Sequence, residues 1–129
     1  MSVGNPVEPS VPAQKQKVTF GKFQNIDLRV GRVLAAPLVQ GSVPPVRQMS
    51  IDVGPLGRRT SVGQFALLPE EELIGCNLAV CVNLGSKEVA GLPSDVLVLG
   101  ARHPASPSGE AQALPLRLAA EATPGSPIY

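Results

Sequence analysis

Five cationic side chains are best placed to do chemistry in this sequence, because each lies near a glycine, a turn or a predicted strand end. Cations in such positions can bind phosphate groups by releasing condensed counterions. The alternative is ordinary solvated charge, and Arg29 could in the same way simply pair with Asp27 or another acid. The five residues are Arg32, Arg47, Arg58, Arg59 and Lys87.

The charges are divided unevenly along the chain. The segment from Lys15 to Arg59 carries eight Lys or Arg against two Asp, whereas the segment from Thr60 onward carries three against seven acids. With Glu8, the formal net charge is +1. A basic first half can form a positive surface for phosphate even in a nearly neutral protein. Folding could instead mix the basic and acidic halves on the surface, so that their electrostatic fields cancel.

Hydrogen-bonding side chains flank two apolar segments of the second half. Asn83, Ser94 and Asp95 could line a groove for nucleic acid, with Asn83 and Ser94 contacting phosphates or base edges. They could instead satisfy backbone groups, with Asn83 binding loop amides and Ser94 or Asp95 forming a turn after Pro93. We favour the structural role.

Catalysis is not indicated by the residue types. His103 is the only histidine, and it lies between Arg102 and Pro104 in a predicted solvated loop. No nucleophile elbow, phosphate-binding loop or paired metal-ligand motif occurs. The acidic run 70–72 could suggest a metal site or a general base, but the dipole of a short helix explains it sufficiently. We expect no catalytic residue, no metal and no cofactor.

Alternating apolar residues predict short strands in the first half. The first strand runs from residue 26 to 35, with a change of phase at Gly31 that indicates a β-bulge. A second strand is predicted over residues 49–53 and a third over 58–65. The proline start and glycine end of residues 69–75 predict one helical turn.

The second half predicts two buried strands and an edge strand. Residues 78–84 form the fourth strand. The run 96–99 is apolar at every position and fits a strand covered on both faces. Leu114, Leu116 and Leu118 alternate, and Pro115 restricts this last strand to an edge.

The predicted fold class is all-β. Short strands without βαβ spacing favour a sandwich or small barrel, and a helix between the third and fourth strands is the arrangement of an OB-fold. We predict a five-stranded OB-fold barrel with an extra C-terminal strand over residues 20–118. Residues 1–19 are expected to be a flexible N-terminal tail and residues 119–129 a C-terminal segment.

Cys76 and Cys81 are predicted to be buried free thiols. Five residues apart on one strand, they would lie ~16 Å apart on opposite faces, too far for a disulfide. Free thiols suit a reducing compartment. The N-terminus lacks the pattern of a signal peptide, and no apolar run approaches the ~20 residues that span a bilayer. We expect a cytoplasmic protein without membrane insertion.

Several ordered segments resemble the tRNA-binding domain family, whose members are OB-folds that stand alone or are appended to aminoacyl-tRNA synthetases. The segments are FQNIDLRVGRV at 23–33, IDVG at 51–54, PEEELIG at 69–75, and Asn83-Leu84 followed by AGLPSD at 90–95. The ending Ser94 to Gly100 is more similar to the CsaA subgroup than to the synthetase-appended members, which typically carry Glu-Gly-Met there.

The resemblance implies a small homodimer that binds tRNA, in a subgroup described as export-related chaperones. It also implies hydroxyl contacts to phosphate after the basic start of the third strand. Ser61 keeps one hydroxyl there, whereas Val62 lies near the position of a second, which weakens such a contact. The predicted RNA-binding residues are the five cations together with Ser61, Gln64, Asn83 and Ser94.

Few aromatic residues are available to stack on bases. The sequence holds Phe20, Phe23, Phe65 and Tyr129, and no Trp. OB-folds that hold single strands usually stack bases on aromatic side chains. We therefore expect RNA to be bound by its backbone and shape.

Apolar residues of the second half suggest an alternative function. They could pack a two-fold dimer or line a groove for unfolded preproteins, although burial within one chain must account for at least one face. A third possibility, a pure assembly module, would bind neither ligand. The candidate dimer or peptide contacts are Leu92, Val96, Leu97, Val98 and Leu99.

Overall fold

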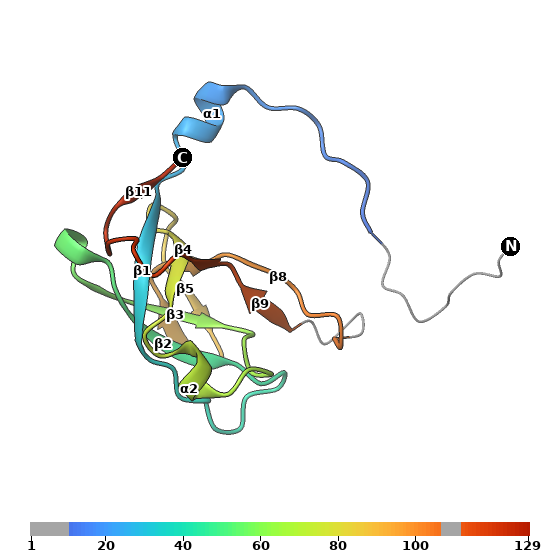
Figure 1. Ribbon diagram of the computed structural model, residues 1–129. Coiled ribbons are helices and arrows are strands. Elements are labelled where there is room, and N and C mark those ends of the chain that lie inside the picture. The colour runs from blue at the N-terminus through green and yellow to red at the C-terminus, as the bar shows by residue number, and fades with distance from the viewer. Residues whose placement is uncertain (1–10, 107–111) are drawn as a thin grey trace, which may run out of the picture.

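The computed structural model describes residues 11–106 and 112–129, which form many short strands, two short α-helices and the 3-10 helix η1 (Gly54–Leu56) (Figure 1). The α-helices are α1 (Phe20–Gln24) and α2 (Glu70–Leu73). The strands are β1 (Leu28–Ala35), β2 (Arg47–Asp52), β3 (Arg58–Gly63), β4 (Asn77–Cys81), β5 (Lys87–Val89), β6 (Leu92–Ser94), β7 (Leu97–Val98), β8 (Gly100–Arg102), β9 (Ala113–Pro115), β10 (Arg117–Leu118) and β11 (Pro127–Ile128). The prediction of a mostly β protein is confirmed.

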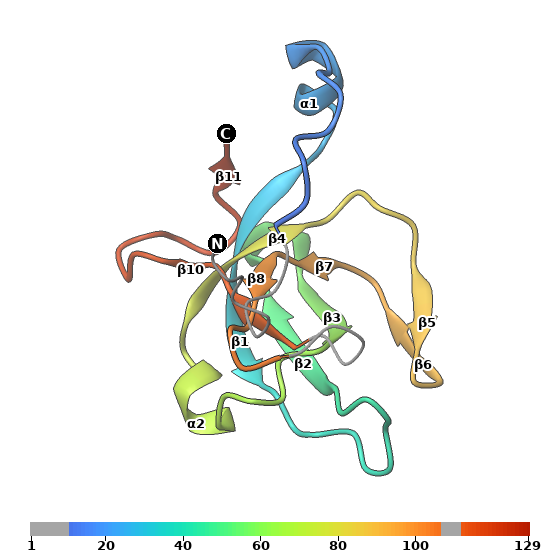
Figure 2. The same cartoon turned by 90° about the vertical axis from the view of Figure 1, so that its right-hand side faces the viewer.

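The strands close into a small barrel. The main sheet has the antiparallel order β10-β4-β1-β2-β3, and β7 also pairs with β4. On the other side of β3, the carbonyl oxygen of Thr60 accepts hydrogen bonds from the backbone N–H groups of Asp95 and Val96, at 2.8 and 3.3 Å. The order of hydrogen-bonded neighbours thus continues from β3 to the segment between β6 and β7, and from β7 back to β4 (Figure 2). With α2 between β3 and β4, this is the predicted OB-fold arrangement.

β1 is shared by both halves of the barrel. Its first part pairs with β4 and its second part with β2. A Cβ atom at Gly31 would lie 2.5 Å from Ile51 Cγ2 and 2.8 Å from Val80 Cγ2, so only glycine fits there without a shift. The bulge predicted at Gly31 is wrong in position, because the register with β2 shifts between Val33 and Ala35.

The core fills the barrel from alternating positions of β2 and the residue that follows it. Met49, Ile51 and Val53 have no exposed surface, as their alternation predicts, and every residue of β4 is buried. Leu73 joins the same apolar cluster, so α2 covers one end of the barrel. Pro69 is the N-cap of α2 rather than its first residue.

The connection after β4 differs most from the prediction. Only Leu97–Val98 forms the strand β7, and Leu97 is 45% exposed whereas Val96 and Val98 are 4% exposed. The prediction that this run is covered on both faces is therefore wrong. The preceding residues form the unpredicted hairpin of β5 and β6, whose turn residues Ala90 and Gly91 both have positive φ, as in a type I′ turn.

Both ends of the described chain add elements that the sequence analysis missed. α1 is capped by Thr19, whose side chain accepts a hydrogen bond from Lys22 N–H, and it has no buried residue. The predicted last strand is split into β9, which pairs with β8, and β10, which pairs with β4 at the sheet edge. β11 pairs with the start of β1 through Leu28 and Ile128.

Both cysteines are free thiols, as predicted, although only Cys81 is fully buried and Cys76 is half-buried. Within residues 11–106 and 112–129, no helix has the length and apolar character needed to cross a membrane.

Arg47 is an interior residue, which corrects its assignment to an RNA-contacting surface. It shares the buried phase of β2 with Met49 and is only 5% exposed. Its guanidinium donates hydrogen bonds to the carbonyl oxygens of Ala36, Phe65 and Leu68, at 2.7, 3.1 and 2.8 Å. The side chain thus ties the end of β1 to the segment after β3.

Replacing Gly31 by Ala should overpack the barrel where β1, β2 and β4 meet. We expect the free energy of unfolding, measured by urea denaturation, to fall by about 1–3 kcal/mol. The control is Gly85→Ala, because a Cβ atom at Gly85 would meet nothing within 4 Å. Equal stability of the two variants would contradict the close approach at Gly31.

Replacing Arg47 by Lys keeps the charge but removes the three-way guanidinium contact. One ammonium group cannot reach all three carbonyl oxygens, so we expect unfolding to become easier by about 2 kcal/mol or more in urea. Arg58→Lys is the matched control, since Arg58 is exposed. An Arg47→Lys protein as stable as this control would show that the carbonyl contacts are dispensable.

Candidate nucleic-acid interface

The outer face of β3 links the two groups of predicted site residues. Ser61 pairs with the fully buried Met49 and is itself 2% exposed, so it points into the barrel. Because side chains alternate along a strand, Arg58, Thr60 and Val62 share the opposite face. From Arg58 to Gln64, just beyond the strand, the chain extends roughly 20 Å.

Charged residues meet at the Arg58 end of this face. In the strand registers, Arg32 of β1 lies opposite Asp52 of β2, and Asp52 lies opposite Arg58 of β3. Arg32 Nε donates to Asn77 Oδ1 at 3.1 Å, and Asp52 Oδ1 accepts from the Gly54 N–H at 2.9 Å. These contacts orient Arg32 and Asp52 without neutralising either arginine by a direct ion pair.

Arg58 and Arg59 differ in how firmly they are held. Arg58 is exposed, whereas Arg59 is half-buried and its Nε donates to the carbonyl oxygen of Leu56 at 3.2 Å. Among the described residues the one ion pair joins Arg29 to Asp27 at 2.6 Å, which was one of the alternatives left open for Arg29. Arg58 is therefore the freer cation for an external phosphate.

Two predicted hydroxyl groups are buried and cannot contact a ligand in this conformation. Ser61 faces the core. Ser94 is 7% exposed, and its Oγ accepts a hydrogen bond from the backbone N–H of Val62 at 2.9 Å. Ser94 thus joins β6 to β3, and both serines are corrected from RNA contacts to structural positions.

Asn83 is exposed but performs the structural role favoured from the sequence. Its Oδ1 accepts from the Asp27 N–H at 2.8 Å, and its Nδ2 donates to the Asn25 carbonyl oxygen at 2.7 Å. Both amide atoms are therefore engaged in fixing the start of β1 against the end of β4.

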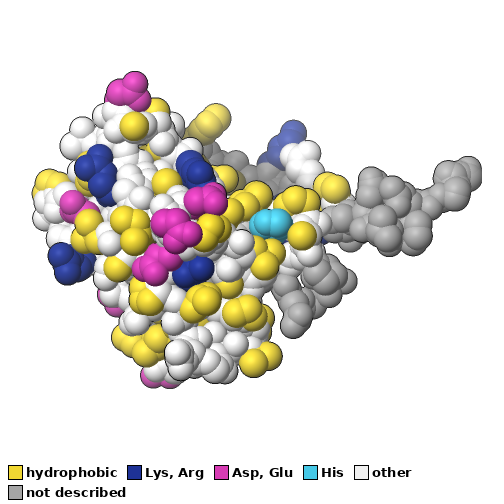
Figure 3. Space-filling view, turned by 60° about the horizontal axis from the view of Figure 1, so that its bottom comes forward, with side chains coloured by type: hydrophobic (Ala, Val, Ile, Leu, Met, Phe, Trp, Pro, Cys, Tyr) yellow, Lys and Arg dark blue, Asp and Glu magenta, His cyan; other side chains and the backbone are white. Residues whose placement is uncertain are grey.

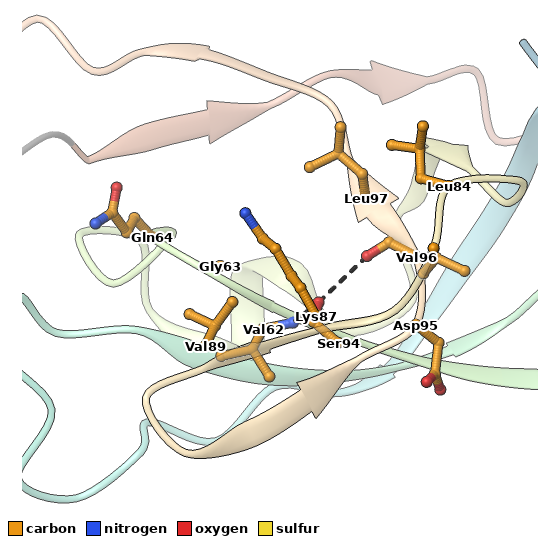
Figure 4. A pocket seen from close by; sticks show the side chains of 11 residues that line it. Val62, Gly63, Gln64, Leu84, Lys87, Val89, Ser94, Asp95, Val96 and Leu97 are labelled. Atoms are coloured by element: carbon orange, nitrogen blue, oxygen red, sulfur yellow. Dashed lines mark hydrogen bonds between the residues drawn. The ribbon is translucent and has the colours of Figure 1, made fainter.

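A groove of about 560 Å³ opens at the other end of β3, between the β5–β6 hairpin and β7. Figure 4 shows the Lys87 amine extending into the space between Gln64 and Leu97, whereas the Asp95 carboxylate points away from it. The fold thus brings together five predicted residues from both groups. They are Gln64, Lys87, Ser94, Val96 and Leu97.

The predicted dimer or peptide contacts are only partly accessible. Val96 and Val98 belong to the apolar core, so their assignment as external contacts is corrected. Leu92 and Leu99 are half-buried. Leu97 remains exposed at the groove, beside Leu84, and each is 45% exposed.

A second hollow of about 330 Å³ adjoins the groove. It lies between the loop 39–46 and the turn of the hairpin, and it shares Gln64 and Val89 with the first groove. The sequence analysis missed Leu84 and Val89 as lining residues. The signal that could have found Val89 is its spacing from Leu92 across Ala90-Gly91, which suits a two-residue hairpin loop.

Basic and acidic side chains are interleaved on the face seen in Figure 3, where dark blue Lys and Arg groups alternate with magenta Asp and Glu groups. On this face folding averages the uneven charge of the sequence. Metal binding has no visible basis in residues 11–106 and 112–129, where no three His, Cys, Asp or Glu side chains are grouped to hold an ion.

Sequence comparison finds relatives among the methionine–tRNA ligases, and no protein-family model matches the chain. It is 32% identical over 97 residues to the ligase of Dichelobacter nodosus, which covers 74% of this chain and 14% of the ligase. It is 31% identical over 122 residues to that of Thermotoga maritima, which covers 95% of this chain and 18% of the ligase. The chain therefore spans less than a fifth of these relatives.

Structural comparison finds a relative of matching size. The crystal structure of the chaperone CsaA from Bacillus anthracis superimposes with a TM-score of 0.73 and 32% sequence identity, covering 88% of this chain and all of CsaA. Identity at this level over the whole of a solved protein, together with the structural similarity, indicates common descent. The chain belongs to the family that contains CsaA and the homologous segment of the methionine–tRNA ligases.

Proposed function

We propose that this protein is a non-enzymatic tRNA-binding protein that acts in the cytoplasm. The observation that carries the proposal is the pair Arg32 and Arg58, which flank Asp52 on neighbouring strands and have no direct ion-pair partner among the described residues. Relatedness to enzymes that act on tRNA supports this ligand. Phosphate contacts supply most of the affinity in such complexes and are independent of sequence.

The proposed contact set is smaller than the one predicted from the sequence. It comprises Arg32 and Arg58 at one end of β3, the half-buried Arg59 beside them on the other face of the strand, and Gln64 and Lys87 at the other end. Arg47, Ser61 and Ser94 are excluded by burial, and Asn83 by its two backbone hydrogen bonds. A spacing of roughly 20 Å between the two ends suits a track along several phosphates of an RNA backbone.

A homodimer is part of this proposal. Two copies would present two cationic faces to one tRNA and raise the effective concentration of the second contact. Apolar side chains are available for such an interface, because α1 buries none of its residues and leaves Phe20 86% and Phe23 49% exposed. Light scattering coupled to size-exclusion chromatography should give the mass of two chains; a monomer would remove this part of the proposal.

Binding of unfolded preproteins is a second candidate function. It is favoured by the groove, where Leu84 and Leu97 expose apolar surface beside the apolar walls Val62 and Val89. Similarity to a protein described as a chaperone supports it as well. The two candidates assign this groove to different ligands.

Replacing Arg58 by Ala should weaken tRNA binding without affecting the fold. We expect affinity to fall several-fold, and the slope of log K against log salt to become shallower by about 0.7–0.9, as for one lost phosphate contact. Fluorescence anisotropy of labelled tRNA over a salt series measures both quantities.

Arg117→Ala is the matched control for this experiment, since Arg117 is an exposed cation on β10, at the opposite edge of the sheet from β3. Equal losses for the two variants would mean that net charge, not the Arg58 position, controls binding. No binding by the wild-type protein, even at low salt, would refute the proposed function.

Salt also separates the two candidate functions. Binding to tRNA should weaken steeply as salt rises, whereas binding of an unfolded apolar peptide should hold or strengthen. A reduced, unfolded protein segment serves as the peptide probe in the same anisotropy assay. Tight, salt-resistant peptide binding together with absent tRNA binding would favour the chaperone function.

A further inference from the structure

Asn77 is a buried polar residue at a point where three parts of the chain meet. It is 3% exposed and lies on β4, where it pairs with Arg32 of β1 on one side and with Leu118 of β10 on the other. Its Oδ1 accepts a hydrogen bond from Arg32 Nε at 3.1 Å. The side chain of Asn77 therefore joins a core strand to one of the cations that we propose to contact phosphate.

The amide nitrogen of Asn77 holds the loop between β10 and β11. Nδ2 lies 3.1, 3.4 and 2.8 Å from the carbonyl oxygens of Ala119, Ala120 and Ala122. An aspartate at position 77 would accept from Arg32 but would have no donor for these carbonyl oxygens. The contacts therefore require a side chain with an acceptor at one end and donors at the other, which asparagine provides.

The same loop also supports the acidic neighbour of Arg32. Gly54 lies so close to the carbonyl oxygen of Pro124 that a Cβ atom at Gly54 would clash with it. The Gly54 N–H in turn donates to Asp52 Oδ1 at 2.9 Å. Figure 1 shows this red C-terminal segment crossing β1 on its way to β11. Through these contacts, the loop 119–125 holds the residues on both sides of Arg32 in the strand registers.

The bond to Asn77 determines which part of the Arg32 guanidinium is left for a ligand. A guanidinium has one N–H group at Nε and four at Nη1 and Nη2. The described residues provide no hydrogen-bond or ion-pair partner for either Nη atom of Arg32. Because the Asn77 amide is neutral, it orients the guanidinium without compensating its charge. Nη1 and Nη2 then form a fork that can bind two oxygens of one phosphate.

We propose that Asn77 is a positioning residue for RNA binding: it holds Arg32 by Nε, so that Nη1 and Nη2 are presented to a backbone phosphate. Through Asn77, the orientation of Arg32 also depends on the loop 119–125. This inference rests on the proposed function and deepens it. An arginine side chain has many rotamers, so holding one of them in the free protein lowers the entropy cost of binding.

A double-mutant cycle on tRNA affinity tests the inference. Asn77→Ala should weaken binding about three- to fivefold in the wild-type background, as for neighbouring residues whose effects are coupled. In the Arg32→Ala background the same substitution should leave the affinity unchanged, because the side chain that Asn77 positions is already absent. Asn83→Ala is the matched control and should leave tRNA affinity unchanged, since Asn83 also binds two backbone groups of a distant segment but does not contact Arg32.

The Nε–H signal of Arg32 in ¹⁵N NMR spectra gives a second readout, which needs no substitution of Asn77. The signal is identified by its loss in Arg32→Lys. It should exchange with water more slowly than the Nε–H of the exposed Arg58, both in the free protein and in the complex with a short RNA hairpin. Equally fast exchange of the two signals would overturn the inference, even if the Asn77→Ala protein does not fold.

The remaining outcomes separate the inference from the proposed function. An equal loss of affinity from Asn77→Ala with and without Arg32 would mean that Asn77 acts through the general fold. Unchanged affinity in Asn77→Ala or in Arg32→Ala would remove that residue from RNA binding. Each of these results would overturn the inference while tRNA binding by the wild-type protein stands. Absence of tRNA binding by the wild-type protein would refute the proposed function and the inference with it.

Discussion

The guanidinium of Arg47 is the contact on which the position of the candidate interface depends. It is buried without a carboxylate partner among the described residues and is satisfied by three backbone carbonyl oxygens. A buried charge is costly unless all its donors are paired, so the carbonyls of Ala36, Phe65 and Leu68 must stay in place around it. This fixes the chain on either side of the loop 39–46 and directly after Gln64. The shape of the groove therefore depends on the buried guanidinium of Arg47.

Hydrogen bonds to backbone groups also close the barrel. Thr60 O accepts from Asp95 and Val96, and Ser94 Oγ accepts from Val62 N–H, so the chain after the β5–β6 hairpin is attached to β3 at the floor of the groove. Elsewhere in the barrel, Gly31 has no side chain, so β1 can lie close to the side chains of Ile51 on β2 and Val80 on β4. The hydrogen bonds between β3 and residues 94–96 thus close the barrel and also shape the groove. A substitution that breaks these hydrogen bonds should therefore disturb both the barrel and the groove.

In the proposed function, the two ends of β3 have different roles. The exposed Arg58 and the half-buried Arg32 and Arg59 near its start would contact phosphates, which carry no sequence information, whereas the groove at its end places Lys87 beside apolar walls. The family contains segments of methionine–tRNA ligases, and it also contains a protein described as a chaperone. An outer face with cations at one end and apolar surface at the other can support either kind of ligand, so salt dependence and groove variants are the informative measurements.

Sequence alone determined the strand content, the core positions of β2, the helix between β3 and β4 and the free cysteines, because these follow from local periodicity, turn residues and short spacing. Tertiary structure decided which polar residues are accessible. Arg47 and Ser94 look like surface groups in the sequence, but distant carbonyl and amide partners make their burial favourable. Leu97 looks like a core residue, yet it is exposed because only one side of β7 is covered. Burial depends on contacts between segments far apart in the chain, which no local pattern records.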